Sequence, residues 1–378
     1  MQFLPVASGK GGVGKSLLAA NLGILLARTG KRVVLADLDF GGSNLHLILG
    51  LRGVTAGIGT FLNDPDVAFE SVVLPTDYPN LHFIPGDNEL PGIANLSSAQ
   101  KRKLMSRLRR IDADFVILDL AAGTGFNVTD FLLMSNHGLI VTTPTPTALV
   151  NAYLCIKNAV FRILTTAIRR GSPADDAYRA ITKDSDTLQR IYFPDLVARI
   201  EEHDPQTVER FQKAVSRFRP RIVMNMIDDP KQVDKVHRLR TSCEQYLGLE
   251  IEHFGVLYRD SLQDTALDAR VPIVRYKPQS VLAQAIARIA DRVIELSDDD
   301  AMAWTDTDES FLAAAADAET DYETRSDYVR ELLHTGALSE GDVVETVKSQ
   351  QIEIGHLRRE NNLLKSKLRT AIQQGFTR

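Results

Sequence analysis

The chain has 378 residues, 44% hydrophobic and 25% charged, which suits one large folded domain with an extension or two domains. The net charge of −5 is uneven, because residues 297–327 hold eleven acids and one base, and the mildly basic remainder is too weakly charged to argue for nucleic-acid binding. Two distant cysteines, Cys155 and Cys243, exclude a zinc knuckle, argue against a disulfide framework and fit a reducing cytosol.

The first motif is Ser-Gly-Lys-Gly-Gly-Val-Gly-Lys-Ser at residues 8–16. Gly9 and Gly14 bracket four residues and precede Lys15 and Ser16, which is the spacing of a phosphate loop. Glycines let consecutive backbone N–H groups surround a polyphosphate, and the helix that follows directs its N-terminus at the same anion. Lys15 is predicted to neutralise the β- and γ-phosphates, and the Ser16 hydroxyl to bind Mg²⁺.

The same glycines also match G-x-G-x-x-G, the fingerprint of a dinucleotide site, with Asp37 near the position of a ribose-binding acid. The adjacent Lys15–Ser16 pair favours a nucleoside triphosphate with Mg²⁺ instead. The predicted nucleotide-binding residues in this stretch are Gly9, Lys10, Gly11, Gly12, Val13, Gly14, Lys15, Ser16 and Leu17.

Buried strands alternate with helices along the chain. A strand over Gln2–Ala7 precedes the loop, although Pro5 is unexpected in a central strand because proline cannot donate to the sheet ladder. A helix over Lys15–Thr29 and a strand over Arg32–Ala36 follow. We therefore predict an α/β fold with a doubly wound, mostly parallel sheet of about seven or eight strands flanked by helices.

Carboxylates follow two of the buried strands. Asp37 and Asp39 come after Arg32–Ala36, and Asp119 comes after Phe115–Leu118. Acids at the carboxyl ends of strands beside a phosphate loop face the nucleotide crevice, where they orient water or hold Mg²⁺. The predicted metal-binding residues are Ser16, Asp37, Asp39 and Asp119.

The predicted domain organisation has three parts. Residues 1–296 form the nucleotide-binding domain, with a charged helical insertion at about 165–218. Acids interleave with the bases of this insertion, which favours a solvated helical hairpin over a DNA or membrane surface. Residues 297–327 are predicted to be an acidic disordered linker, and residues 328–378 a helical or coiled-coil extension.

Two sets of residues spaced by seven support the coiled coil: Val347, Ile354, Asn361 and Leu368, and Gln350, Leu357, Leu364 and Ala371. The second set contains two leucines, the residue preferred at this position, and the asparagine in the first set is a register device of parallel two-stranded coils. The alternative is a single amphipathic helix that folds back on the nucleotide-binding domain.

Lys10 lies inside the loop, and Lys-Gly-Gly-Val-Gly-Lys-Ser resembles the hallmark of the ParA/MinD family of deviant phosphate-loop ATPases. The resemblance implies that Lys10 reaches the nucleotide of a partner subunit, so that ATP binding and dimerisation are coupled. It also implies that Asp39 is the hydrolytic acid and Asp37 a supporting one. The catalytic residues would then be Lys10, Lys15, Asp39 and Asp119.

Further stretches resemble the flagellar FlhG/FleN branch of this family. They are Asp119–Gly123, which resembles the Walker B and switch II region, and Thr143–Tyr153. By the same resemblance Asn225 contacts the adenine edge, for which an amide offers both a donor and an acceptor. Tyr258 and Asp260 would flank the base.

The function predicted from this resemblance is that of a MinD/FlhG-like spatial regulator. It would bind ATP or ADP with Mg²⁺, hydrolyse ATP slowly with stimulation by a partner, and position or count a flagellum or other polar machinery. Its partners would be a second copy and a protein activator or cargo adaptor, with a membrane surface less supported. One alternative is a ParA-type partitioning ATPase that binds DNA non-specifically, and another is a coiled-coil scaffold with ATP as a structural ligand.

The predicted location is the cytoplasm, with peripheral binding at the inner membrane or cell pole as a variant. No run in the sequence approaches the roughly 20 apolar residues of a membrane span.

Overall fold

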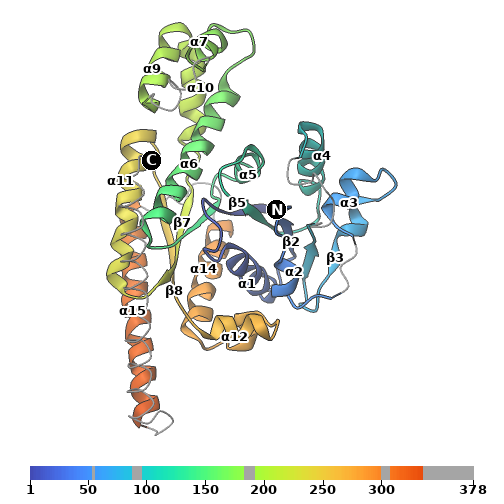
Figure 1. The fold of residues 1–378 in the computed structure, drawn as a ribbon, viewed down its shortest axis with the longest axis vertical. Helices are drawn as coiled ribbons and strands as arrows, with labels where there is room; N and C mark the ends of the chain where they lie inside the picture. Colours follow the sequence, from blue (N-terminus) through green and yellow to red (C-terminus); the bar gives the residue numbers. More distant parts are fainter. Residues whose placement is uncertain (53–55, 87–95, 183–191, 299–306, 335–378) are drawn as a thin grey trace, which may run out of the picture. The chain divides into compact units, whose positions relative to one another are not determined.

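The computed structural model describes residues 1–52, 56–86, 96–182, 192–298 and 307–334 (Figure 1). These residues form a sheet of eight strands in the order β3-β4-β2-β5-β1-β6-β7-β8. All pairs are parallel except β3 with β4 at one edge, which confirms the predicted doubly wound α/β fold. The strands are β1 (Gln2–Ser8), β2 (Val33–Leu38), β3 (Leu74–Pro75), β4 (Leu81–Ile84), β5 (Phe115–Ala122), β6 (Leu139–Thr142), β7 (Arg221–Ile227) and β8 (Glu252–Tyr258).

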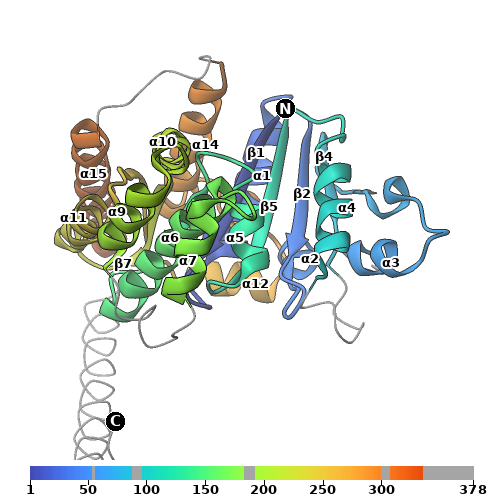
Figure 2. The same cartoon turned by 90° about the horizontal axis from the view of Figure 1, so that it is seen from above.

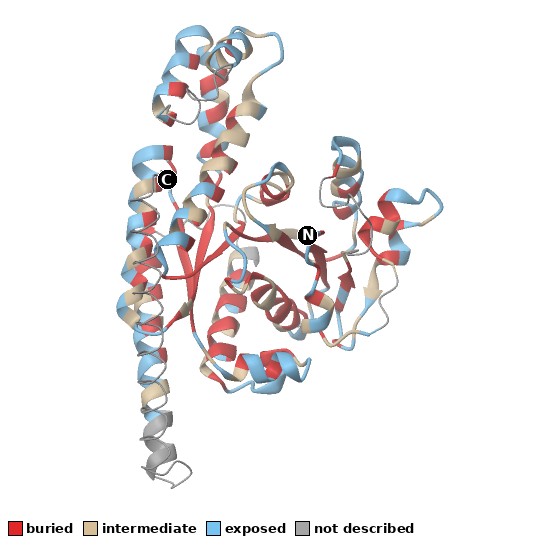
Figure 3. Cartoon of the chain, in the orientation of Figure 1, coloured by how far each residue is buried: buried red, intermediate tan, exposed pale blue. Residues whose placement is uncertain are grey.

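Helices cover both faces of the sheet (Figure 2). One face packs on α1 (Lys15–Arg28), α12 (Leu262–Asp268), α13 (Ile273–Tyr276) and α14 (Val281–Asp298). The other packs on α3 (Ile58–Asn63), α4 (Ser98–Leu108), α5 (Phe126–Leu132), α6 (Pro146–Ala167) and α11 (Lys235–Leu247). The central strands are accordingly buried on both sides (Figure 3). Such burial explains the continuous apolar runs of the sequence, because parallel strands covered on two faces do not alternate.

Pro5 does lie in a central strand, since β1 is between β5 and β6. The backbone N–H of Gln2 donates to Asp114 O on the β5 side. Because N–H groups alternate along a strand, the nitrogen of Pro5 faces the β6 side. Pairing with β6 begins only at Val6, so the missing donor of Pro5 costs the ladder no hydrogen bond.

The long helix α6 has 22 residues and is apolar enough to cross a membrane by length and composition. It buries one stripe of side chains against the sheet and neighbouring helices, among them Ala152, Ile156 and Val160. This packing is that of the core helix of a folded domain.

The predicted charged insertion is helical and begins within the last turns of α6. It contains α7 (Pro173–Thr182), α9 (Phe193–His203) and α10 (Pro205–Val215). Phe193 packs between Phe161 of α6, with ring centroids 4.7 Å apart, and Phe211 of α10, at 5.8 Å. The charges face outward around an apolar seam, as expected for amphipathic helices.

The prediction of a disordered linker over 297–327, of which residues 299–306 lie outside the described residues, is wrong for residues 307–327, which are helical. Helix α15 (Thr307–His334) begins there, and its residues up to Asp321 belong to the same compact unit as the sheet. Arginines of α11 and α14 pair with the acids: Arg240 with Asp308 at 2.6 Å, Arg292 with Asp317 at 2.7 Å, and Arg288 with Asp321 at 2.5 Å. The high density of acids in this segment suggests mutual repulsion, but arginines of the neighbouring helices neutralise them.

Phe311 anchors the start of α15. Its ring is 4% exposed and lies 4.8 Å from the ring of His237 and 5.4 Å from that of His253. The remaining part of α15, from Tyr322 to His334, belongs to a second unit. The predicted coiled-coil positions between Val347 and Ala371 lie outside the described residues.

Candidate functional site

The phosphate-binding loop joins β1 to α1 at the carboxyl-terminal edge of the sheet. Gly14 has φ +88°, a left-handed conformation that favours glycine, and a Cβ on it would lie 2.2 Å from Asn225 Nδ2. A Cβ on Gly9 would lie 2.0 Å from the backbone oxygen of Asn151 in α6. The glycines therefore allow the loop to turn and also to pack closely against Asn225 and Asn151.

Lys15 and Ser16 lie beside Asp119 of β5. Lys15 Nζ donates to Asp119 Oδ1 at 2.6 Å and to Ser16 Oγ at 3.3 Å. Lys15 is 6% exposed and Asp119 1%. Burial raises the pKa of Asp119, and the charge and hydrogen bond of Lys15 oppose that rise. The structure thus brings together the lysine, hydroxyl and carboxylate that the sequence predicted.

Asp37 and Asp119 are direct neighbours in the register of β2 and β5. Oδ2 of Asp37 accepts from Ser43 Oγ at 2.6 Å and from the N–H of Leu45 at 3.3 Å, and its Oδ1 accepts from the N–H of Asp39 at 3.1 Å. Burial, followed by the charge of Asp119, raises the pKa of Asp37 to about 7. These bonds give Asp37 the geometry of a carboxylate that holds the following loop in place.

Asp39 is the more accessible acid of the pair, because it is half-buried where Asp37 is fully buried. Its negative charge is one of the causes that raise the pKa of Asp119, so the two carboxylates act on each other across the crevice. An accessible carboxylate is a group that can accept a hydrogen bond from water.

The segment after Asp119 is tied to the phosphate loop. Gly123, at φ +112°, donates its N–H to Ser8 O at 2.9 Å, and Ser8 Oγ donates to Lys10 O at 3.0 Å. Asn158 Nδ2 of α6 donates to Thr124 O at 3.0 Å. Only a glycine adopts this φ readily, so the turn after β5 depends on glycine at this position.

Of the three residues predicted at the base, only Asn225 touches the loop. Its Nδ2 donates to Val13 O at 2.8 Å, and its Oδ1 accepts from the N–H of Met226. The hydroxyl of Tyr258 donates to Ala318 O at 2.8 Å, so this side chain points to α15 and not into the crevice. Asp260 Oδ1 accepts from the N–H of Leu262 at 3.0 Å, at the start of α12.

Sequence reasoning missed the residues that support the site from outside the motifs. Ser43 follows the acids by a few positions, and its hydroxyl in a glycine-rich turn is a signal that could have been noticed. Asn151 and Asn158 contact the loops from α6, and nothing in their spacing marks them.

The residues present fit a nucleotide with Mg²⁺. Ser16 Oγ and the carboxylates of Asp39 and Asp119 are hard oxygen donors, which suit Mg²⁺. Among the described residues, no group of three His, Cys, Asp or Glu side chains forms a metal cage of its own. This matches the usual Mg²⁺ site at a nucleotide, where protein groups share the ion with phosphates.

Comparison with known proteins gives the same picture. A family model described as the CobQ/CobB/MinD/ParA nucleotide binding domain matches residues 4–294. The flagellum site-determining protein YlxH of Helicobacter pylori is 32% identical over 163 residues, or 41% of this chain and 53% of that protein. The septum site-determining protein MinD of Synechocystis is 37% identical over 153 residues, or 40% and 56%. The chain thus spans about half the length of these two curated relatives.

The antiactivator FleN of Pseudomonas aeruginosa is 27% identical over 195 residues, which cover 49% of this chain and 69% of FleN. Among solved structures, MinD of Pyrococcus horikoshii in complex with Mg-ADP aligns with a TM-score of 0.55 and 19% identity, over 78% of this chain and 97% of that one. That likeness shows the fold. Because the family model covers most of the chain and the phosphate loop has the predicted geometry, the chain belongs to the CobQ/CobB/MinD/ParA family of nucleotide-binding proteins.

Proposed function

We propose that this protein is an ATP-hydrolysing spatial regulator of the MinD/FlhG kind, which dimerises when it binds ATP. The observation that carries the proposal is the group formed by Lys15, Ser16 and Asp119, with the accessible Asp39 at the open side of the crevice. The names of its relatives, a flagellum site-determining protein, an antiactivator and septum site-determining proteins, support a role in positioning or counting a cellular structure.

Each residue of the site has a role in this proposal. Lys15 neutralises phosphate charge, and Ser16 and Asp119 hold the magnesium ion, which supplies charge neutralisation at the phosphates. Asp39 accepts a hydrogen bond from the attacking water, and Asp37 keeps the loop that carries Asp39 in place through Ser43 and Leu45. Asn225 supports the loop through its hydrogen bond to Val13, and we assign it to the adenine base.

Exposed residues in and around the loop support an ATP-dependent dimer. Lys10, Gly11 and Gly12 are exposed. Phe126, at the start of α5, is 78% exposed, and Val150, beside the Asn151 that touches Gly9, is 58% exposed. Apolar groups beside an exposed cationic loop suit a face that a second copy covers, with Lys10 reaching the partner's phosphates.

Light scattering of the full chain tests the proposal, with wild type, Asp39→Ala and Asp39→Ala/Lys10→Ala each in MgADP and in MgATP. We expect Asp39→Ala to gain mass in MgATP relative to MgADP, because ATP binds and hydrolysis stops. Loss of Lys10 should abolish that gain, whereas Asp39→Ala/Lys213→Ala, which loses an exposed lysine of α10, should keep it. A mass that ignores the nucleotide in every variant would refute the switch and favour a constitutive scaffold.

A further inference from the structure

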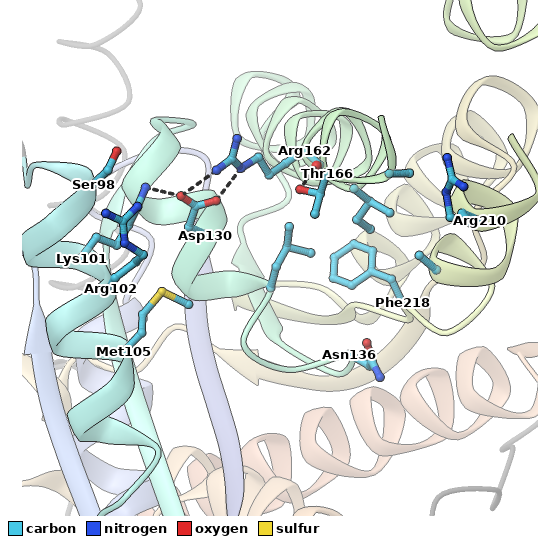
Figure 4. Close-up of a pocket in the computed structure, with 14 residues that line it drawn as sticks. Ser98, Lys101, Arg102, Met105, Asp130, Asn136, Arg162, Thr166, Arg210 and Phe218 are labelled. Atoms are coloured by element: carbon cyan, nitrogen blue, oxygen red, sulfur yellow. Dashed lines mark hydrogen bonds and ion pairs between the residues drawn. The ribbon is translucent and has the colours of Figure 1, made fainter. Parts of the chain in front are cut away.

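A second cavity lies between α4, α5, α10 and the last turns of α6 (Figure 4). Its volume is about 580 Å³, within the range of small-molecule sites. Asn136 and Phe218 line it shortly before β6 and β7 begin, so it lies at the amino-terminal edge of the sheet. The phosphate loop follows the end of β1, at the opposite edge, and the cavity is therefore separate from the nucleotide site.

Cationic side chains dominate the polar lining of this cavity. They are Lys101, Arg102, Arg162 and Arg210, and the one carboxylate among the lining residues is that of Asp130. Both oxygens of Asp130 are already used: Oδ1 accepts from Arg162 Nε at 2.5 Å, and Oδ2 accepts from Arg162 Nη2 at 3.2 Å and from Lys101 Nζ. The cavity thus carries more positive charge than its own carboxylate compensates.

Arg102, which is exposed, and Arg210 make no ion pair within 4.0 Å to a described carboxylate. The hydrogen bond from Thr207 and the charge of Arg210 nevertheless both lower the pKa of Asp204. Arg210 Nη2 donates to Thr207 Oγ1 at 2.6 Å, but Arg210 Nε is buried and has no acceptor among the described residues. Burying a donor without an acceptor costs free energy, and an anion bound in the cavity would remove that cost.

Apolar surface also lines the cavity, from Met105, Leu133, Ile163 and Phe218. Figure 4 shows the Phe218 ring between the part of the cavity near Asp130 and Arg210. A simple inorganic ion would leave this surface in contact with water. A ligand that combines negative charge with an apolar body would cover it and meet the arginines.

We propose that this cavity binds a small organic anion, a phosphate ester or carboxylate with an aromatic or aliphatic body. Arg102 and Arg210 bind the anionic groups from opposite walls, and the side chains around Phe218 contact the apolar body. Planar guanidinium groups suit both kinds of oxyanion, because they offer two parallel donors.

The same helix reaches both sites. The first turns of α6 contact Gly9 of the phosphate loop through Asn151, and Arg162 lines the cavity eleven residues later. At 1.5 Å per residue this places the two contacts about 16 Å apart along one rigid element.

The fluorescent probe anilinonaphthalene sulfonate, an aromatic anion, tests the proposal on the full chain saturated with MgADP, so that the nucleotide crevice is occupied. We expect saturable binding of one probe per chain that weakens with added salt. Arg102→Gln/Arg210→Gln should lower the affinity about tenfold or more, because the sulfonate loses its charge-assisted hydrogen bond to an arginine and the cavity loses two positive charges. Ala214→Phe, which adds a large side chain at the cavity wall without changing charge, should also weaken binding.

The matched control is Arg109→Gln/Arg217→Gln, which removes two exposed arginines from outside the cavity and should bind the probe like wild type. Competition by phenyl phosphate and by benzoate then identifies which oxyanion the site prefers. Absence of a saturable site, equal affinity in the cavity variants and the control, or failure of both competitors to displace the probe would each overturn the proposal. None of these results depends on ATP hydrolysis or dimerisation.

Discussion

At the scale of single residues, the site depends on contacts between groups far apart in the chain. Asn225 Nδ2 bonds to Val13 O, and the same nitrogen occupies the space that a Cβ on Gly14 would need. Gly12 also has a positive φ, of +74°, but a Cβ there would meet no atom within 4 Å. A side chain at position 12 would therefore cause backbone strain alone, whereas a side chain at position 14 would cause strain and also collide with Asn225.

We expect Gly12→Ala to cost about 1–2 kcal/mol of stability, the cost of a left-handed conformation for an alanine. Gly14→Ala should cost more in urea unfolding, because it must also displace the buried Asn225 amide. In the double variant Gly14→Ala/Asn225→Ala the total should be less than the sum of the single effects. Equal costs for the two glycines would show that the loop relaxes around the new methyl group.

At the scale of elements, α15 is the helix whose attachment is best defined by contacts. Beyond its ion pairs, Ser310 Oγ accepts from the N–H of His253 at 3.2 Å, and Tyr258 donates to Ala318 O. Both His253 and Tyr258 belong to β8, so the first half of α15 packs along the edge strand of the sheet. Phe311 provides the apolar anchor of this contact.

We expect Phe311→Ala to loosen the attachment of residues 307–321. The free energy of opening this segment should fall by about 3 kcal/mol, because a buried ring is lost. Native-state hydrogen exchange of its backbone amides measures that change. Leu312→Ala, next in sequence but 72% exposed, should leave exchange unchanged. Equal protection in both variants would mean that the arginine–aspartate pairs hold the segment without the ring.

The same contact predicts a dependence on pH. Burial, with the charges of His237 and Arg292, lowers the pKa of His253 from 6.5 to about 3. Both of its ring nitrogens are buried and have no hydrogen-bond partner in the part of the chain that the structure describes. As pH falls from 6.5 towards 3, His253 binds a proton in the unfolded chain but stays neutral in the folded chain. The free energy of unfolding therefore decreases in that pH window.

Acid titration followed by circular dichroism checks this dependence. We expect His253→Phe, which keeps a ring against Phe311 but cannot be protonated, to lower the pH midpoint of unfolding. His203→Phe, at an exposed position, is the control and should keep the wild-type midpoint. A midpoint that stays the same in both variants would assign the acid sensitivity to other groups.

The extent to which the sequence predicts the structure differs from one element to another. The phosphate loop and the strand-end acids were predictable because their chemistry requires fixed spacing over a few residues. The contact of Asn225 with Val13 spans 212 positions, and the arginines that neutralise the acids of α15 come from two other helices. The hydroxyl of Tyr258 reaches Ala318, 60 positions away. None of these contacts leaves a local pattern, which is why 297–327 read as a linker and why Tyr258 was assigned to the crevice.

At the scale of the whole molecule, the exposed apolar groups near the nucleotide crevice are expected to mediate self-association. In the Asp39→Ala background, Phe126→Asp should weaken the ATP-dependent gain of mass, because it places a charge in the proposed dimer face. Leu312→Asp, similarly exposed but on α15, should leave the gain intact. Light scattering over a range of protein concentrations measures both, and equal behaviour of the two variants would move the dimer face elsewhere.

The position of α15 has a further consequence for assembly. An edge strand with free backbone groups invites another chain to extend the sheet, and proteins that polymerise often do so by that route. Here β8 has α15 along it, and the opposite edge is the two-residue antiparallel strand β3, interrupted by Pro75. Within the described residues one edge of the sheet is partly covered and the other is short, so addition of copies edge to edge is disfavoured. Among the described residues, this leaves side-chain surfaces to mediate association, which favours closed assemblies of defined size over open-ended filaments.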